Sequence, residues 1–381
     1  MGDLVEVDNG HSWDDQRSTS DALRGRCAVA RENGTWVALR HAEVVAAATD
    51  AEVFSSRVTT RRAIPNSLDG TDHAAYRAVV DRYLTDDRVA REESQCRAHA
   101  AAIVDGLPLG VAVKTIADIG TPYAVRSQSS WLGWPSDLED ELVEWIRDNH
   151  AASRSGSRDA MRQVAERFDH MIRGLLEPRR DAPTTDVTGE LLGDTVDGRP
   201  LTTDEIVSIL RNWTAGDLGS LATSIGVLVH FLAARPSIQR EVRALVEAND
   251  HLALVAVVEE ILRIDDPFVS SRRVTTRTVI LGGEEIGEGQ QVLLNWTAAN
   301  RDPLVFADPN RYNPAENAPH NLVFGIGPHA CPGKGLTLME LRVMLEELLA
   351  RTSWIEPAPG RPAVRETPPV GGWARVPVVL R

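Results

Sequence analysis

The chain contains 381 residues, too many for one small module and too few for three domains. Asp and Glu number 55 against 41 Lys and Arg, and the resulting net charge of −14 argues against nucleic acid or an anionic membrane surface as a partner. Hydrophobic residues make up 43 % of the sequence, which excludes bulk disorder and predicts a sizeable core.

The cysteines and the N-terminus indicate a reducing compartment. Cys27, Cys96 and Cys331 are far apart and form no CxxC pair, so a structural zinc site or a four-cysteine iron–sulfur cluster within the chain is excluded. The first 17 residues are acidic and lack an apolar stretch, unlike a signal peptide. No apolar run reaches the roughly 20 residues of a membrane span. We expect a cytoplasmic protein without a membrane partner.

Helical patterns dominate the chain, and we expect a single domain over residues 1–381. The coarse class is mainly α with a minor β portion. Short strands are predicted at 36–39 and 376–380, and a hairpin at 275–281 and 290–294 around GGEEIGEG. Residues 177–186 are expected to form a surface loop and residues 300–328 a long irregular segment. Helices are predicted at 136–149, 159–176, 202–234 and 334–351.

The helix predicted at 202–234 is unusual because it is long and apolar on most sides. Thr202 and Glu205 fit a capping box at its start, and Pro236 stops it. Such a helix is expected to run buried through the middle of the molecule. Its centre, AGDLGS at residues 215–220, contains two glycines that lower helix propensity by about 1 kcal/mol each. We therefore expect another group to approach the helix backbone closely at these glycines.

One cysteine stands at the end of the long irregular segment, in FGIGPHACPG at residues 324–333. The helix predicted to follow presents free N–H groups and the positive end of its dipole, both of which favour a thiolate at Cys331. Gly325 and Gly327 permit positive φ and a close approach to a flat ligand. Pro332 has no N–H, so hydrogen bonds to the sulfur are expected from Gly333 and Lys334.

These ten residues match FGxGxHxCxG at every fixed position, and the segment resembles the heme-binding loop of cytochromes P450. The resemblance implies the cytochrome P450 fold, a triangular prism with a long central helix over the heme. It also implies heme b (iron protoporphyrin IX) as cofactor, with Cys331 as the metal ligand. Phe324, Gly325 and Gly333 then lie against the heme.

The resemblance extends over most of the chain. Glu260 and Arg263 match the ExxR pair of the family, which locks the loop beneath the heme, and their i,i+3 spacing lets them pair on one helix face. Residues 300–303 and 309–312 resemble parts of the segment called the meander, with Tyr312 where Phe is more usual.

Buried heme propionates need cationic partners. The family uses a His and an Arg four residues apart, which His73 and Arg77 match, and an Arg after the ExxR segment, for which Arg273 fits and Arg272 competes. His329 is a further propionate partner by resemblance.

The centre of the long helix departs from the family, which usually carries an adjacent acid and alcohol for proton delivery. Aligned on Ala215 and Gly216, these positions hold Leu218 and Gly219, whereas the acid Asp217 lies one residue early and Ser220 one late. Three interpretations compete. Asp217 and Ser220 form a relocated pair, or ordered water carries protons through the space that Gly219 leaves, or the enzyme uses peroxide or another heme-thiolate reaction. We favour the first two together.

The resemblance implies a monooxygenase that inserts one atom of dioxygen into a small organic substrate, by hydroxylation or oxidative dealkylation. A peroxide-driven peroxygenase is the alternative, and a heme-based sensor is disfavoured because no output segment is recognisable. The chain ends 50 residues after Cys331, so electrons are expected from a separate ferredoxin and ferredoxin reductase acting on a monomer. Basic residues that are candidates for docking the donor are Lys334, Arg342 and Arg97. Candidate substrate contacts are Phe268, Val269, Ala215 and Gly216.

Overall fold

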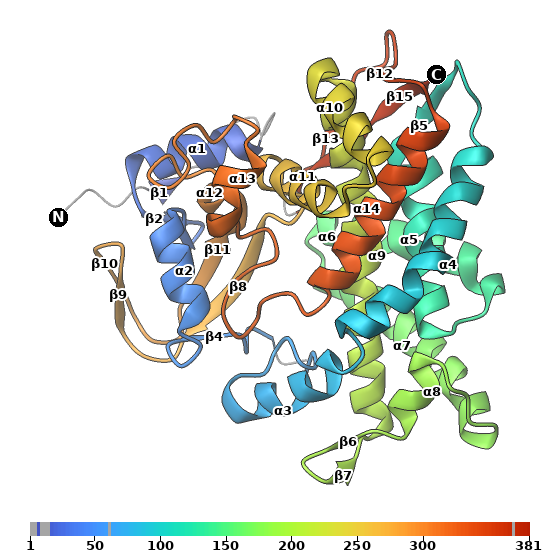
Figure 1. Ribbon diagram of the computed structural model, residues 1–381. Coiled ribbons are helices and arrows are strands. Elements are labelled where there is room, and N and C mark those ends of the chain that lie inside the picture. The colour runs from blue at the N-terminus through green and yellow to red at the C-terminus, as the bar shows by residue number, and fades with distance from the viewer. Residues whose placement is uncertain (1–5, 8–15, 60–61, 368–369) are drawn as a thin grey trace.

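The computed structural model describes residues 6–7, 16–59, 62–367 and 370–381. A helical part and a sheet-containing part lie side by side, and the segment that precedes the last helix runs between them (Figure 1). The mainly α class with a minor β portion is confirmed. The α-helices are α1 (Gln16–Arg26), α2 (His41–Thr49), α3 (Gly70–Asp81), α4 (Asp86–Asp105), α5 (Thr121–Leu132), α6 (Glu139–Ser155), α7 (Arg158–Asp181), α8 (Val187–Leu192), α9 (Thr203–Ala233), α10 (Pro236–Glu247), α11 (His251–Ile264), α12 (Trp296–Ala299), α13 (Pro314–Asn317) and α14 (Lys334–Arg351).

The largest sheet joins strands from both ends of the chain. Its order is β1 (Glu6–Val7), β2 (Val29–Glu32), β3 (Thr35–Ala38), β11 (Gln291–Asn295), β8 (Ser270–Thr275) and β4 (Phe54–Ser55). A second sheet has the order β12 (Ile355–Pro357), β15 (Pro377–Leu380) and β5 (Ala112–Lys114). Three two-stranded pairs complete the β portion: β6 (Thr195–Val196) with β7 (Arg199–Pro200), β9 (Val279–Leu281) with β10 (Glu284–Ile286), and β13 (Val364–Arg365) with β14 (Trp373–Arg375).

Helix α9 is the centre of the helical part. The predicted capping box is present, because the Thr202 side chain accepts from the Glu205 backbone N–H and the Glu205 carboxylate accepts from the Thr202 backbone N–H. The helix has 31 residues, most of them buried, and packs against α5, α7, α11 and α14. It is long and apolar enough to cross a membrane, but two-thirds of its most apolar stretch is buried inside the protein. That burial is typical of a core helix.

Two sequence predictions differ from the structure. Helix α7 continues through Pro178 to Asp181, so half of the expected loop at 177–186 is helical. A proline late in a helix loses only one backbone hydrogen bond, and Arg179 anchors this end by an ion pair with Asp186 at 3.1 Å. In place of the one expected hairpin, the structure has two, one inside the other. Strand β8 pairs with β11 in the outer hairpin, and β9 pairs with β10 at the tip.

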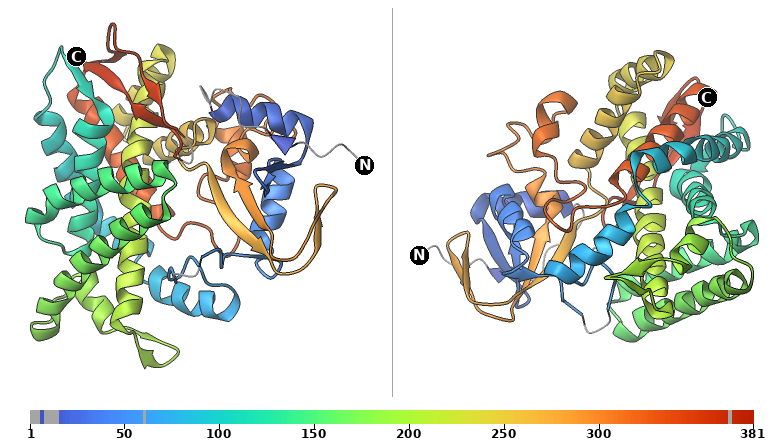
Figure 2. Two further views of the ribbon diagram at one scale, coloured as in Figure 1. Left: turned by 180° about the vertical axis from the view of Figure 1, so that it is seen from behind. Right: turned by 60° about the horizontal axis from the view of Figure 1, so that its bottom comes forward.

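Helices α6 and α7 are antiparallel neighbours that lie across one side of α9 (Figure 2). Only Gly156 and Ser157 connect them, and Gly156 makes the turn with a φ of 64°. At this end of α6, Arg154 reaches across to Glu366, after β13, with an N–O distance of 2.7 Å. The pair joins the α6–α7 unit to the C-terminal part of the chain.

Candidate active site

The loop that carries Cys331 is shaped by its two glycines. Gly325 and Gly327 have φ of 69° and 77°, as expected, and the Cys331 backbone N–H donates to the Phe324 carbonyl at 2.8 Å. A methyl group on Gly327 would lie 2.8 Å from the Ala48 carbonyl oxygen at the end of α2. The loop is therefore pressed against α2, and only glycine fits at residue 327.

The Cys331 side chain faces a cavity, and α14 begins three residues later. Burial raises the pKa of its thiol, while a hydrogen bond from the Gly333 backbone N–H acts in the opposite direction. The expected donor at Gly333 is thus in place. A thiolate in this setting needs a positive centre next to it, which a metal ion supplies.

The cavity has a volume of about 1140 Å³ and lies between the Cys331 loop and α9. It exceeds the usual range for one small ligand, about 300–1,000 Å³. Its lining includes loop residues on one side and α9 residues on the other: Phe324, Gly325, His329, Cys331, Gly333, Asn212, Trp213, Gly216, Asp217, Ser220 and Ser224. The cavity thus has room for a flat cofactor and a substrate together.

The predicted pair of Glu260 and Arg263 lies beneath the loop and is almost completely buried. Arg263 donates two parallel hydrogen bonds to the Glu260 carboxylate, at 2.7 and 2.9 Å. It also donates to the carbonyls of Asn300 at 2.8 Å and Pro309 at 3.2 Å, while the Asn313 backbone N–H donates to Glu260 at 2.9 Å. The pair therefore ties helix α11 to the irregular segment that leads into the Cys331 loop.

Three of the predicted propionate partners gather at one end of the cavity. Arg273 is buried, and burial holds the pKa of its guanidinium below the ordinary value; its one hydrogen bond among the described residues is to the Arg272 carbonyl, at 2.8 Å. The rings of His73 and His329 lie 4.1 Å apart. Burial, assisted by His73 and Arg273, lowers the pKa of His329 to about 4. Arg272 also lines the cavity but is exposed.

Arg77 has a different partner set. Its Nη1 donates to the carbonyls of Pro328 and Ala330 at 2.9 and 3.0 Å, and its Nε pairs with Asp81 at 2.9 Å. The side chain lines the cavity and at the same time holds the loop. Arg77 thus holds the Cys331 loop in the structure, and its contact with a heme propionate stays a prediction.

These residues fit a heme. Among the described residues, the buried guanidinium of Arg273 has no ion pair and the buried Nε2 of His329 has no hydrogen bond, and both groups suit an anionic ligand at this end of the cavity. Asp69 is 3.4 Å from that Nε2, but the contact does not have hydrogen-bond geometry. The carboxylates of a heme would complement the charge of Arg273, and the sulfur of Cys331 would hold its iron.

The structure separates the residues at the centre of α9. Leu218 is completely buried in the core, away from the cavity. Asp217 and Ser220 both line the cavity, as the relocated pair requires. The Ser220 hydroxyl donates to the Gly216 carbonyl at 2.7 Å, so its lone pairs stay available as acceptors. Burial raises the pKa of Asp217 to about 7.

Gly219 does not leave open space. A methyl group there would lie 2.9 Å from Nε2 of His150, on α6. The interpretation in which ordered water carries protons through the space beside Gly219 is therefore wrong, because the His150 imidazole occupies that space. Gly216 is different, since a methyl group there would meet nothing within 4 Å.

Two residues of this region, His150 and Glu340, were not predicted from the sequence. Glu340 on α14 is fully buried, neither carboxylate oxygen has a partner among the described residues, and burial together with the charge of Asp217 raises its pKa well above the usual range. The sequence carries no signal for Glu340, because its burial is set by the helices packed around α14. His150 had none, because its position depends on how α6 crosses α9.

Of the four candidate substrate contacts, Gly216 and Phe268 line the cavity. Phe268 is 54 % exposed, as expected for a side chain at the rim. Ala215 packs against the main core instead. Val269 packs against Gly371, where an added methyl group would lie 2.7 Å from its Cγ2. Neither Ala215 nor Val269 belongs to the cavity lining found for the described residues.

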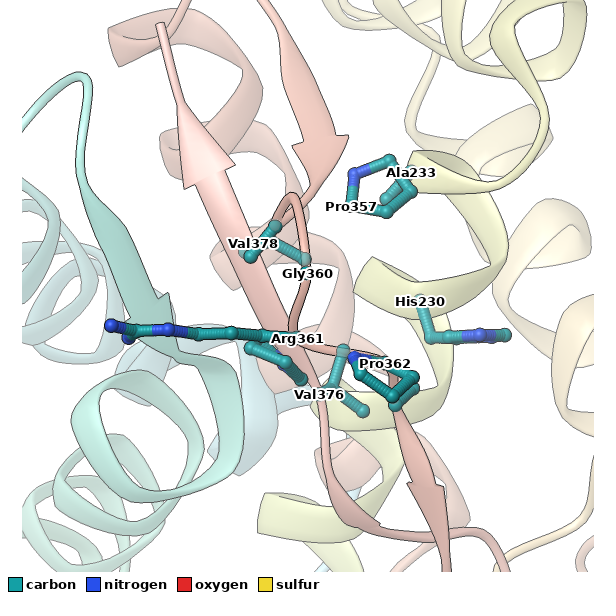
Figure 3. Close-up of a pocket in the computed structure, with 11 residues that line it drawn as sticks. His230, Ala233, Pro357, Gly360, Arg361, Pro362, Val376 and Val378 are labelled. Atoms are coloured by element: carbon teal, nitrogen blue, oxygen red, sulfur yellow. The ribbon is translucent and has the colours of Figure 1, made fainter.

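A second hollow of about 370 Å³ lies between the end of α9 and the strands β12 and β15. The His230 ring and the Arg361 side chain extend in opposite directions there (Figure 3). The rings of His230 and Trp373 are tilted by 34° with centroids 3.8 Å apart, and burial lowers the pKa of His230 to about 4. No two polar side chains labelled in this view converge, so the chemistry belongs to the larger cavity.

Comparisons with known proteins agree with this geometry. The family model described as Cytochrome P450 matches residues 128–374. The Nocardicin C N-oxygenase of Nocardia uniformis subsp. tsuyamanensis is 30 % identical over 375 residues, covering 92 % of this chain and 90 % of that protein. The Cyclomarin C epoxidase CymV of Salinispora arenicola is 28 % identical over 355 residues, covering 88 % of each. The structure of cytochrome P450 CYP109Q5 from Chondromyces apiculatus superposes with a TM-score of 0.87 at 25 % identity, covering 100 % of this chain and 99 % of that one.

The chain belongs to the cytochrome P450 family. It is an oxidoreductase of the monooxygenase type, and its cofactor is heme b.

Proposed function

We propose that the protein is a heme-thiolate monooxygenase that hydroxylates or oxidatively dealkylates a small organic substrate in the cytoplasm, as a monomer supplied with electrons by a separate ferredoxin and its reductase. The observation that supports the proposal is the position of the Cys331 sulfur, which faces the same cavity as Asp217 and Ser220 on α9. The bound heme supplies the activation of dioxygen.

The protein's own groups have separate tasks. The Gly333 N–H group stabilises the sulfur anion, and the Glu260–Arg263 pair keeps the loop in place. Asp217 holds a proton near neutral pH because its pKa is about 7, which suits a group that both takes up and releases protons. Ser220 offers an acceptor one helical turn away, since its own proton is engaged by Gly216. Phe268 lies where it can contact a substrate ring.

A reduced carbon monoxide complex tests the ligand assignment. We expect the absorption band typical of thiolate-ligated heme in the wild type, its loss in Cys331→Ser and its retention in the matched control Cys96→Ser, because Cys96 is buried elsewhere, on α4. If the band survives in Cys331→Ser, Cys331 is not the ligand.

A peroxide-driven reaction is the second candidate, supported by the absence of an acid at Leu218 and of a hydroxyl at Gly219. The two candidates are separated by product yield with hydrogen peroxide alone against yield with reductant and dioxygen. In Asp217→Asn we expect reductant consumption to become uncoupled from product. Unchanged coupling would remove Asp217 from the proton path and favour the peroxide reaction.

The basic residues predicted to dock the electron donor are already paired. Arg97 and Arg342 connect α4 to α14 through Glu93, Glu346 and Glu347, with N–O distances of 2.6–2.9 Å. Lys334 pairs with Glu259 at 2.6 Å. We therefore propose that ferredoxin docking depends weakly on these charges, to be measured as the salt dependence of electron transfer in Lys334→Gln. A large loss of rate at low salt in that variant would contradict this.

A further inference from the structure

Two polar side chains of α9, one turn apart, hold the segment between β4 and α3. The Ser208 hydroxyl oxygen accepts from the Ile64 backbone N–H at 2.9 Å, and Nδ2 of Asn212 donates to the Ile64 carbonyl, also at 2.9 Å. Both polar backbone groups of Ile64 are therefore bound to the helix. The next two residues, Pro65 and Asn66, line the cavity, and so does Asn212 itself.

The partners of Asn212 fix the orientation of its amide group. Nδ2 donates to the Ile64 carbonyl at 2.9 Å and to the Ser208 carbonyl at 2.8 Å. Both acceptors are carbonyl oxygens, which have no proton to donate, so the nitrogen of the amide must face them. A flipped amide would place its oxygen against two other oxygens. The direction of Oδ1 is thus determined by the hydrogen bonds of Nδ2.

Oδ1 of Asn212 is an acceptor without a donor. Within the part of the chain that the structure describes, no group donates to this oxygen, and it is not one of the buried side-chain atoms that are sealed from solvent. The side chain is half-buried and lines the cavity. An amide oxygen whose water is displaced by a ligand needs a donor on that ligand, because an unpaired acceptor costs free energy.

The place of Asn212 on α9 relates this oxygen to the open part of the cavity. Gly216 follows one turn later and also lines the cavity, and a methyl group on Gly216 would meet nothing within 4 Å. One helical turn is about 5.4 Å long. A molecule held at Oδ1 therefore has room to extend along α9 past Gly216, into the part of the cavity that Asp217 and Cys331 line.

We propose that Asn212 is a specificity-determining residue, and that the substrate is a small organic molecule with a hydroxyl or N–H group that donates a hydrogen bond to its Oδ1. The proposal rests on the proposed function, because it assigns one chemical feature to the substrate of the same cavity. Nδ2 is occupied by the two carbonyls, so the amide presents only an acceptor. Ethers and ketones, which have no proton to donate there, are selected against because they leave Oδ1 unpaired.

Probes that bind the heme iron test the acceptor while the natural substrate is unidentified. The comparison is between 1-phenylimidazoles with a hydroxyl group at the meta or para carbon and their methyl ethers. Dissociation constants are measured from the spectral shift of the ferric holoenzyme. In the wild type, at least one phenol should bind about 10-fold more tightly than its ether. This advantage should disappear in Asn212→Leu, which keeps the side-chain volume and removes the acceptor.

Ser208→Ala is the matched control. It removes the hydrogen bond of the Ile64 N–H and so loosens the same segment, but it leaves the Asn212 amide in place. We expect this control to retain the advantage of the phenol. Equal binding of phenols and ethers in the wild type, an advantage that survives in Asn212→Leu, or an equal loss in Ser208→Ala would each overturn the proposal.

Two further measurements keep the outcome decisive. If Asn212→Leu does not fold, Asn212→Gln replaces it, since that variant keeps an amide but moves the oxygen by one methylene group, and an undiminished advantage there would overturn the proposal. The reduced carbon monoxide band of the wild type is recorded in parallel. Its absence means that the proposed function fails, whereas equal binding of phenols and ethers beside a normal thiolate-type band overturns only the role of Asn212.

Discussion

Replacing Arg263 by Gln should destabilise the protein far more than an ordinary charge substitution. The side chain is fully buried, and its loss leaves the Glu260 carboxylate, itself 2 % exposed, without its cation. Breaking a buried pair by removing one partner costs about 3–5 kcal/mol, because an uncompensated buried charge remains. The carbonyls of Asn300 and Pro309 lose a donor as well, so we expect the upper part of that range.

Urea unfolding followed by tryptophan fluorescence measures the loss. For a dependence of about 3 kcal/mol per M of urea, a loss of 4 kcal/mol lowers the midpoint by about 1.3 M. Arg147→Gln is the matched control. It removes an Arg from an i,i+3 pair with Glu144 at 3.1 Å, but that arginine is 71 % exposed. We expect the control to change stability by about 0.5 kcal/mol or less.

Two further variants keep the test informative if Arg263→Gln does not fold. Arg263→Lys keeps the charge but cannot form the two parallel hydrogen bonds, so an intermediate loss is expected. Glu260→Gln combined with Arg263→Met removes both charges and should be less damaging than Arg263→Met alone. If Arg263→Gln costs no more than the exposed control, or if the double variant is the worst of all, the reasoning from buried charge is refuted.

Three other predictions concern stability. Asp217→Asn should stabilise the protein at pH 8 and have little effect near pH 4. The Asp217 carboxyl is protonated in the folded state up to about pH 7 but ionises near pH 4 in the unfolded state. The stability of the wild type therefore falls as pH rises between these values, by up to about 4 kcal/mol. A difference in urea midpoints that does not change with pH would contradict this. Gly327→Ala should lower the free energy of unfolding by about 1–3 kcal/mol, because residue 327 has a positive φ and the added methyl group would meet the Ala48 carbonyl of α2. The control Gly335→Ala, whose methyl group would meet nothing within 4 Å, should be neutral or stabilising in the same unfolding assay. Thr202→Ala should cost about 1 kcal/mol through the lost cap of α9, and thermal unfolding that matches the wild type would show that the capping box contributes nothing.

The sequence predicted local features whose causes are local. The capping box of α9 and the glycines of the Cys331 loop depend on a few adjacent residues, and α14 occupies the predicted residues 334–351. Cys331 was found because ten consecutive residues carry the pattern. Glu260 and Arg263 were found because one helix holds both.

Features that depend on two elements crossing were less predictable. Arg77 and Arg273 are both predicted propionate partners, yet Arg77 binds loop carbonyls, whereas Arg273 has no ion pair within the part of the chain that the structure describes. The environment of Gly219 is set by α6, about 70 residues earlier, and the burial of Glu340 is set by helices packed around α14. Aligned positions on α9 gave Leu218 as the acid site, but helix rotation turns that side chain into the core.

The two-residue connection between α6 and α7 has a consequence for how substrates enter. With only Gly156 and Ser157 between them, α6 and α7 have no long loop that could move by itself, so a displacement of one helix at this end would be passed on to the other. The ion pair between Arg154 and Glu366 holds this end of the two helices against the C-terminal part of the chain. If substrates enter past these two helices, we expect α6 and α7 to move together, and hydrogen exchange on weakening the Arg154–Glu366 pair should accelerate in both helices and not in one alone.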